Sequence, residues 1–258
     1  MNREKITARL LEAGIENAAG EAALLTEAFD NEALTRAVER RCAHYPLQYI
    51  LGTWDFYRER YKVNEHCLIP RSDTEILVDT AIKMLPNGAH FLDLCTGSGC
   101  VAISTLANRP DTVATAIDLF PQTLALATEN AQSNNVSARF TPLLANVLEA
   151  PPNLLFRDTF AAILSNPPYI RDEVVPTLQQ EVAHEPRAAL CGGPDGLDFY
   201  RAILEKWTAL LSRDGAVLFE IGYDQKQDIT ALAAKYGYTC DVKKDFGGND
   251  RVAILRRR

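Results

Sequence analysis

From residue 89 onward, short apolar runs alternate with helix-length amphipathic segments, and this alternation constrains the fold more than any other feature of the chain. It predicts a doubly wound, mostly parallel sheet with helices on both faces. Seven strands are expected, at 89–94, 112–118, 138–144, 160–165, 216–221, 238–245 and 251–256. Helices are expected at 98–108, 121–134, 198–211 and 225–236.

The N-terminal part has a different pattern. Apolar stripes within residues 1–52 predict a small helical domain. Aromatic residues and Val63 among charged residues predict a β-hairpin linker at 53–70, which leaves 71–258 as the main α/β domain. Ser72 and Glu75 have the spacing of a capping box, so a helix is expected to start there and to run to about Leu85.

Composition excludes some classes of protein. The 258 residues carry a net charge of -7, which argues against a protein that grips long nucleic acid through its phosphates. No cysteine pair has C-x-x-C spacing and no histidine has zinc-finger spacing, so no metal site is expected. The cysteines are interpreted as reduced thiols of a cytoplasmic protein, and no segment has the length and hydropathy of a membrane span or a signal peptide.

A glycine loop follows the first strand of the α/β region. Asp93 and Leu94 end the strand, and Cys95, Thr96, Gly97, Ser98 and Gly99 lead into the next helix. Two glycines allow a tight turn and a close approach of a ligand to the backbone, and the helix start offers free N–H groups to an anion. The second strand ends in Asp118, followed by Leu119, and a carboxylate there can accept both hydroxyls of a ribose.

This loop fits more than one ligand. Gly97, Gly99 and Asp118 also fit the looser dinucleotide fingerprint, and a tight turn without a ligand remains an alternative. Asp93 favours S-adenosylmethionine over NAD, because a carboxylate can help neutralise the ammonium group of that methyl donor. Asn146 and Val147 follow the third strand, where an adenine edge should lie; Asn146 can accept from the exocyclic amine, although it fits a polar loop residue equally well.

The fourth strand runs into Asn166-Pro167-Pro168-Tyr169. The prolines have no N–H and keep the residue before them extended, which leaves a stiff segment with unpaired carbonyl acceptors. Asn166 Oδ1 and the Pro167 carbonyl could accept both hydrogens of a planar NH2 group and point its nitrogen at a methyl group. A simple turn after a buried strand is the alternative.

These segments together resemble the HemK/PrmC family of protein-glutamine N5-methyltransferases. The resemblance covers nearly the whole chain, including the helical N-terminal part. It includes Pro46-Leu47-Gln48-Tyr49-Ile50-Leu51-Gly52, Leu68-Ile69-Pro70-Arg71, Asp73-Thr74-Glu75, His184-Glu185-Pro186, Gly192-Gly193, Asp195-Gly196-Leu197, Asp245-Phe246-Gly247 and Asn249-Asp250-Arg251. The chain departs from the family pattern at Cys95, where the family often has glycine, and at Asn146, where it usually has an acid.

The resemblance implies a class I methyltransferase fold. It also implies that the enzyme transfers a methyl group from S-adenosylmethionine to the glutamine in the Gly-Gly-Gln motif of peptide chain release factors. S-adenosylhomocysteine would be the product. Residues 95–99 would line the amino-acid part of the donor, Asp118 the ribose, and Asn146-Val147 the adenine. Residues 166–169 would hold and orient the glutamine amide as the catalytic segment. Arg71 could steer the release-factor loop, although a structural ion pair explains it equally well.

Four other functions are alternatives to this one. A nucleic-acid adenine methyltransferase uses a similar pocket but would need a basic channel and base flipping. A methyltransferase for a ribosomal-protein glutamine fits the same residues. An NAD-dependent oxidoreductase would lack a proton relay in Asn166–Tyr169. A non-catalytic binding module would not need Gly97, Gly99, Asp118 and Asn166 together. The expected enzyme acts as a monomer, without contacting nucleic acid or membrane.

Overall fold

The computed structural model describes residues 1–157 and 159–258. Its centre is a seven-stranded sheet with the strand order β5-β4-β3-β6-β7-β9-β8, and a separate two-stranded sheet pairs β1 with β2. The strands are β1 (Thr53–Phe56), β2 (Glu59–Lys62), β3 (His90–Leu94), β4 (Val113–Asp118), β5 (Phe140–Leu144), β6 (Phe160–Ser165), β7 (Leu211–Glu220), β8 (Tyr238–Lys244) and β9 (Asp250–Arg257).

Strands β3 to β7 are parallel, and β9 runs antiparallel to both β7 and β8. The predicted mostly parallel, seven-stranded sheet is therefore confirmed. The helices are α1 (Arg3–Glu12), α2 (Ala18–Ala28), α3 (Asn31–Cys42), α4 (Leu47–Leu51), α5 (Glu75–Met84), α6 (Cys100–Asn108), α7 (Pro121–Ser133), α8 (Asp198–Ala202) and α9 (Lys226–Lys235). No helix among the described residues is long and apolar enough to cross a bilayer.

Helices cover both faces of the sheet. Because side chains alternate along a strand, neighbouring residues of β7 enter different cores. Leu218 packs with residues of α5 and α6, whereas Val217 and Phe219 pack with Trp207 and with Ile229 of α9. The strand order reverses between β3 and β6, which are neighbours although two strands separate them in sequence. Ligands bind at such switch points, at the carboxyl ends of the strands.

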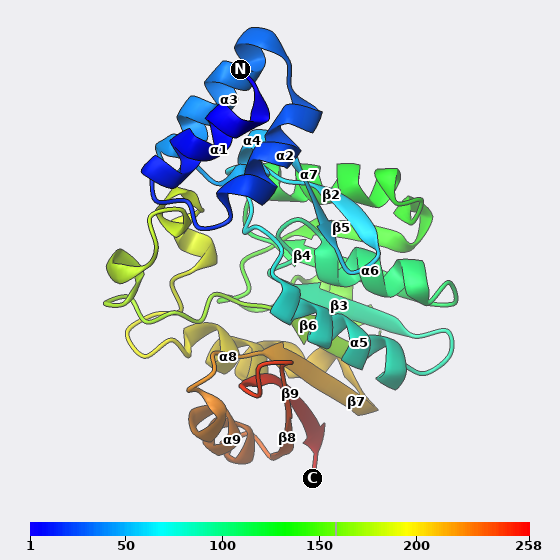
Figure 1. The fold of residues 1–258 in the computed structure, drawn as a ribbon. Helices are drawn as coiled ribbons and strands as arrows, with labels where there is room; N and C mark the ends of the chain where they lie inside the picture. Colours follow the sequence, from blue (N-terminus) through cyan, green and yellow to red (C-terminus); the bar gives the residue numbers. More distant parts are fainter. Residues whose placement is uncertain (158) are drawn as a thin grey trace.

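The first four helices form a cap at one end of the molecule (Figure 1). They enclose a small core of their own, which includes Ile6, Leu25 and Val38. The β1–β2 hairpin connects the cap to the sheet, and its buried Tyr61 shares a 2.6 Å hydrogen bond with Ser104 of α6. The expected helical region and hairpin are therefore present, and the domain boundaries at residues 52 and 70 stay a prediction.

The predicted capping box is wrong. Residues Ser72–Thr74 form a 3-10 turn, and α5 begins at Glu75 with Thr74 at its N-cap and no side-chain cap. The Glu75 carboxylate instead accepts a 2.9 Å hydrogen bond from the backbone N–H of Tyr57 in the hairpin turn. The Glu75 carboxylate, which the local pattern predicted to cap the helix, is thus hydrogen-bonded to Tyr57, a residue distant in sequence.

The predicted helix at 198–211 also differs in detail. It begins with α8, widens into a π-helical segment at Ile203–Trp207 and ends in a 3-10 turn at Thr208–Leu210. The wider segment contains the buried Trp207, whose indole N–H donates to the Val147 carbonyl over 2.9 Å. Strand β7 then begins at Leu211, five residues before the expected start, because the polar residues 212–215 conceal it in the sequence.

Candidate active site

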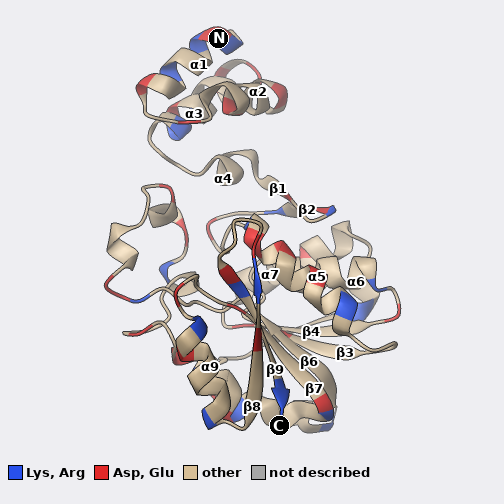
Figure 2. Cartoon of the chain, turned by 60° about the horizontal axis from the view of Figure 1, so that its bottom comes forward, with Lys and Arg blue, Asp and Glu red and all other residues tan. Residues whose placement is uncertain are grey.

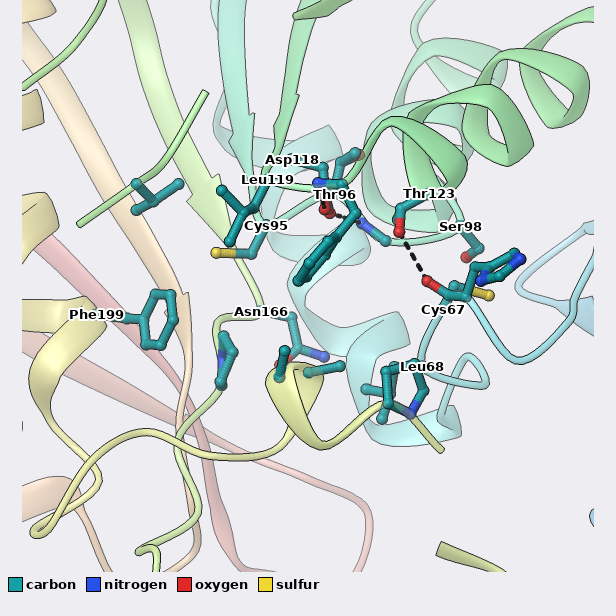
Figure 3. A pocket seen from close by; sticks show the side chains of 18 of the residues that line it. Cys67, Leu68, Cys95, Thr96, Ser98, Asp118, Leu119, Thr123, Asn166 and Phe199 are labelled. Atoms are coloured by element: carbon teal, nitrogen blue, oxygen red, sulfur yellow. Dashed lines mark hydrogen bonds between the residues drawn. The ribbon is translucent and has the colours of Figure 1, made fainter. Parts of the chain in front are cut away.

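Two cavities lie at the carboxyl edge of the parallel strands. The larger has a volume of about 340 Å³ and reaches from the loop after β3 to the loops after β4 and β5. The smaller, of about 150 Å³, lies beside the segment after β6. Four residues line both cavities: Leu68, Arg71, Asn166 and Ala189. The two spaces therefore meet at Asn166, which faces the middle of the larger cavity in Figure 3.

The loop after β3 forms one end of the larger cavity and makes the tight turn predicted from its glycines. Gly97 and Gly99 have φ values of +57° and +82°, in the left-handed region that glycine adopts at low cost. A Cβ atom at Gly99 would also lie 2.7 Å from Ile103 Cδ1. Cys95 has a φ of +63° without being glycine, so this departure from the family pattern carries backbone strain.

Asp118 lies beside this loop, at the end of β4, and lines the larger cavity with Leu119 (Figure 3). Its Oδ2 accepts a 3.0 Å hydrogen bond from the Gly97 N–H, and its Oδ1 accepts a 3.2 Å bond from the Phe120 N–H. Burial raises the pKa of Asp118, and these backbone donors oppose that effect. The carboxylate is thus held rigidly, and each oxygen keeps a lone pair for a ligand hydroxyl.

Asp93 lies beneath the glycine loop and is buried. Its Oδ2 accepts hydrogen bonds from the Thr96 hydroxyl over 2.7 Å and from the Ala102 N–H over 3.2 Å. Burial raises the pKa of Asp93 to about 7. The carboxylate therefore holds the loop against the start of α6, and its predicted effect on a donor ammonium stays a prediction.

Asn146 and Val147 line the larger cavity at the end where adenine was predicted. Asn146 Oδ1 already accepts a 3.0 Å hydrogen bond from the Leu148 N–H, and its Nδ2 donates to Glu149 over 3.0 Å. Only one lone pair of the amide oxygen is left for a ligand. The predicted adenine contact of Asn146 is therefore restricted to that lone pair.

Asn166 follows β6 at the carboxyl edge of the sheet, and it lines both cavities. Its Nδ2 donates a 3.1 Å hydrogen bond to Thr74 Oγ1. Asn166 Oδ1 and the Pro167 carbonyl accept no hydrogen bond from residues 1–157 or 159–258. Pro168 lines the larger cavity, whereas Pro167 and Tyr169 line the smaller one. The segment therefore offers two open acceptors, one on a residue that lines both cavities and one on a residue that lines the smaller cavity.

A second loop holds this segment in place. The Gly192 N–H donates to the Ile170 carbonyl over 2.8 Å, and a Cβ atom at Gly192 would lie 2.7 Å from Tyr169 Cα. A Cβ atom at Gly196 would lie 2.4 Å from the Tyr169 carbonyl oxygen. Both glycines are thus needed for the loop to approach the backbone of the Asn166–Tyr169 segment.

Arg71 lines both cavities and forms an ion pair with Glu185. Glu185 is buried and also accepts a 3.0 Å hydrogen bond from the Ile69 N–H. Arg71 therefore forms the structural ion pair that was one of its two predicted roles. Its predicted role in steering the release-factor loop stays a prediction.

Sequence reasoning missed two polar residues behind the segment. The sequence marks Thr74 only as part of the Asp73-Thr74-Glu75 segment and Glu220 only as part of the strand at 216–221. Glu220 ends β7 in the way that Asp118 ends β4, so an acid closing an apolar run was the signal that could have found it. Both residues are buried, and the Tyr169 hydroxyl donates to Glu220 Oε1 over 3.4 Å.

A polar atom without a partner supports a polar ligand in the larger cavity. Ser98 Oγ is buried and has no partner with good hydrogen-bond geometry in the described part of the chain. Its polar neighbour is the weak acceptor Cys100, whose pKa burial raises and Ser98 lowers. Ser98 lines the cavity with Thr96 and Asp118. Since buried polar groups are normally paired, this hydroxyl fits a ligand with a polar group near the glycine loop. S-adenosylmethionine, with its amino-acid and ribose groups, fits this set of residues.

Comparison with known proteins also indicates a methyltransferase. The family model described as "Methyltransferase small domain" matches residues 72–193. The crystal structure of a methyltransferase from Pyrococcus furiosus has the same fold, with a TM-score of 0.57 and 20% sequence identity, over 76% of this chain and 87% of that one.

Curated relatives are closer in sequence. The release factor glutamine methyltransferase of Thermodesulfovibrio yellowstonii is 39% identical over 229 residues, which cover 85% of this chain and 79% of the relative. The protein of that name from Moorella thermoacetica is 40% identical over 227 residues, which cover 86% and 79%. The chain is therefore a methyltransferase, and it belongs to the release factor glutamine methyltransferase family.

Proposed function

We propose that this enzyme transfers the methyl group of S-adenosylmethionine to the side-chain amide nitrogen of the glutamine in the Gly-Gly-Gln motif of peptide chain release factors. One observation carries the proposal. Asn166, which lines both cavities, and Pro167, which lines the smaller one, each keep an oxygen that accepts no hydrogen bond from the described residues. The larger cavity suits the donor, and the smaller one suits an extended glutamine side chain.

The donor would be held by residues from three strand ends. Cys95, Thr96, Gly97, Ser98 and Gly99 would surround its amino-acid part, while Asp118 and Leu119 would bind the ribose and Asn146 and Val147 the adenine. Asp93 would act from beneath the loop. When bound, the donor supplies a methyl group on a positively charged sulfur, which a nucleophile can attack.

The chain orients the acceptor nitrogen. A planar amide can donate one hydrogen to Asn166 Oδ1 and the other to the Pro167 carbonyl, which fixes the plane of the amide and the direction of its nitrogen lone pair. Tyr169 and Pro168 would pack against the amide, and Arg71 would face the approaching loop. Alignment of this kind can lower a barrier by roughly 7–11 kcal/mol at best. The nitrogen loses its proton after the new N–C bond has formed, so no strong base is needed first.

The partner assignment follows from the relatives and from the charge pattern. Figure 2 shows lysine and arginine interspersed with aspartate and glutamate rather than gathered along one element, which suits a protein substrate better than long nucleic acid. We place the enzyme in the cytoplasm as a monomer, where it would meet release factors without contacting nucleic acid or membrane.

The test uses labelled donor with a release factor or with its Gln→Ala variant at the Gly-Gly-Gln loop. Labelling of the natural release factor alone supports the proposal. Equal labelling of both proteins would overturn it. A ribosomal protein that carries a methylatable glutamine serves as the third substrate, and preferential labelling of that protein would reassign the acceptor.

A further inference from the structure

Two buried polar side chains, Thr74 and Glu220, lie behind Asn166. Asn166 Nδ2 donates to Thr74 Oγ1 over 3.1 Å, and Glu220 lines the smaller cavity with Asn166. The Thr74 hydroxyl lies near the Glu220 carboxylate, whose pKa it lowers, without a direct hydrogen bond between them in the structure. Thr74 and Glu220 are 1% and 2% exposed. The residues come from three separate places in the fold, the turn before α5, the end of β6 and the end of β7.

Glu220 has an unused acceptor. Its Oε1 accepts from the Tyr169 hydroxyl over 3.4 Å, whereas its buried Oε2 lacks a partner with hydrogen-bond geometry among the described residues. Glu220 also lines the smaller cavity, together with Asn166 and Tyr169. A buried carboxylate oxygen without a donor is costly, so it attracts the nearby hydroxyl proton.

The Thr74 hydroxyl can donate a hydrogen bond to only one of its two neighbours, Asn166 and Glu220, at a time. A hydroxyl has one proton to donate, and Thr74 Oγ1 already accepts from Asn166 Nδ2. Its proton is therefore available for the carboxylate of Glu220. In this arrangement the amide oxygen of Asn166 points away from Thr74, since the NH2 group occupies that side.

We propose that Thr74 and Glu220 are positioning residues: the Thr74 hydroxyl donates to the Glu220 carboxylate and accepts from Asn166 Nδ2, which turns Asn166 Oδ1 toward the amide of the substrate. This inference rests on the proposed function of Asn166. It explains why a buried acid is kept beside a site whose reaction needs no strong base before transfer. The ionised carboxylate, which can only accept, sets the direction of both hydrogen bonds.

A proton on Glu220 reverses this direction. The protonated acid can donate to Thr74, which then donates to Asn166 Oδ1 and turns the NH2 group of Asn166 toward the substrate NH2. Two donors then face each other and the amide is not held. Transfer should therefore decrease as the pH falls and Glu220 becomes protonated.

The surroundings of Glu220 place this change near neutrality. Burial raises the pKa of Glu220 to about 7, and Asp73 in the turn before α5 raises it as well. Thr74, Arg251 on β9 and the Tyr169 hydroxyl lower it. Two further titratable groups interact with the carboxylate, the Cys100 thiol on α6 and the Tyr200 hydroxyl on α8, and burial raises the pKa of both so that they stay neutral.

The test compares four proteins by kcat for methyl transfer to a release factor, KM for that protein and calorimetric donor affinity. They are wild type, Thr74→Val, Thr74→Ser and Thr105→Val. Thr105 is a buried threonine of α6 that lines neither cavity, and its hydroxyl donates to the Val101 carbonyl within the helix. We expect Thr74→Val to lose about tenfold in kcat, the value of one hydrogen bond, and Thr74→Ser to recover it. Donor affinity shows that each variant is folded, and Thr105→Val should match wild type.

The pH profile separates positioning from packing. Wild-type kcat should rise through about pH 7 as Glu220 ionises. This rise should disappear in Glu220→Gln, which cannot ionise. It should also disappear in Thr74→Val, which has no hydroxyl to link the protonation state of Glu220 to the orientation of the Asn166 amide. A Thr74→Val enzyme with wild-type kcat and an unchanged profile would overturn the inference while leaving the proposed function intact. Absence of transfer by the wild-type enzyme would instead overturn the proposed function.

Discussion

Arg41 of the helical cap forms an ion pair with Glu181, a residue of the long segment between β6 and α8, over 3.1 Å. His44 contacts the same carboxylate over 3.0 Å. Leu178 and Val182, on either side of Glu181, line the smaller cavity. The cap is thereby joined to one wall of the proposed glutamine site, so it can affect catalysis without touching the reacting atoms.

Replacing Arg41 with Met should weaken recognition of the protein substrate. The substitution keeps an apolar stem but leaves Glu21 and Glu181 without their shared cation. We expect KM for the release factor to rise about tenfold, because the wall at Leu178 and Val182 loses its tether, while donor affinity stays unchanged. Arg36→Met, which removes an exposed helix pair with Glu32, is the matched control. Equal KM values for the two variants would contradict the tether.

Gly192→Ala should damage the catalytic segment directly. The added methyl group would lie 2.7 Å from Tyr169 Cα, and backbone cannot give way as a side-chain end can. We expect kcat to fall by about 100-fold as the open acceptors shift, because small misplacements at a reacting centre are costly. Gly247→Ala is the control, since its new Cβ meets only side-chain atoms of Asn249 and Asp245 at 3.2 Å or more. Wild-type turnover by Gly192→Ala would show that the loop does not position the segment.

Asp118→Asn should weaken donor binding, because the variant keeps the shape of the side chain but loses the charge and one of the acceptor oxygens. Calorimetry should show a loss of donor affinity of about tenfold or more, the value of a hydrogen bond to a charged group. Asp241→Asn removes an exposed charge on β8 and should bind the donor normally. If Asp118→Asn also bound normally, the ribose would not lie at the end of β4.

Glu220→Gln should stabilise the fold at alkaline pH. The pKa of Glu220 is raised from 4.5 to about 7, so between these values the folded protein holds a proton that the unfolded chain has released. Folding stability therefore falls as the pH rises through this range, at about 1.4 kcal/mol per pH unit for a fully linked group. Glutamine lacks this linkage. Urea unfolding should show a gain for the variant at pH 8 and none at pH 4. A constant difference across that range would contradict the shift.

Local sequence patterns predicted the strands well. A strand with one exposed face alternates apolar and polar residues, and a strand buried on both faces of a parallel sheet is a continuous apolar run. Phe160–Ser165 and Val113–Asp118 are examples, and both deliver site residues to the same edge. The glycine loop and Asn166 could be placed for the same reason, since parallel strand ends converge.

Contacts between distant segments could not be predicted in this way. Glu75 was assigned to a helix cap, but the hairpin N–H of Tyr57 binds its carboxylate. Thr74 gained its position behind Asn166 only because the turn before α5 folds against the end of β6. The segment between β6 and α8 has short 3-10 turns and no long periodic pattern, so its contact with the cap through Glu181 was invisible in the sequence.

The most direct test of the proposed glutamine site is the effect of Asn166→Ala on methyl transfer and on donor binding. Asn166 lies where the two cavities meet and supplies one of the two open acceptors. Methyl transfer to the release factor should fall by about 100-fold or more, while calorimetric donor affinity stays close to that of wild type. Retained transfer by the Asn166→Ala enzyme would show that the glutamine amide is held elsewhere.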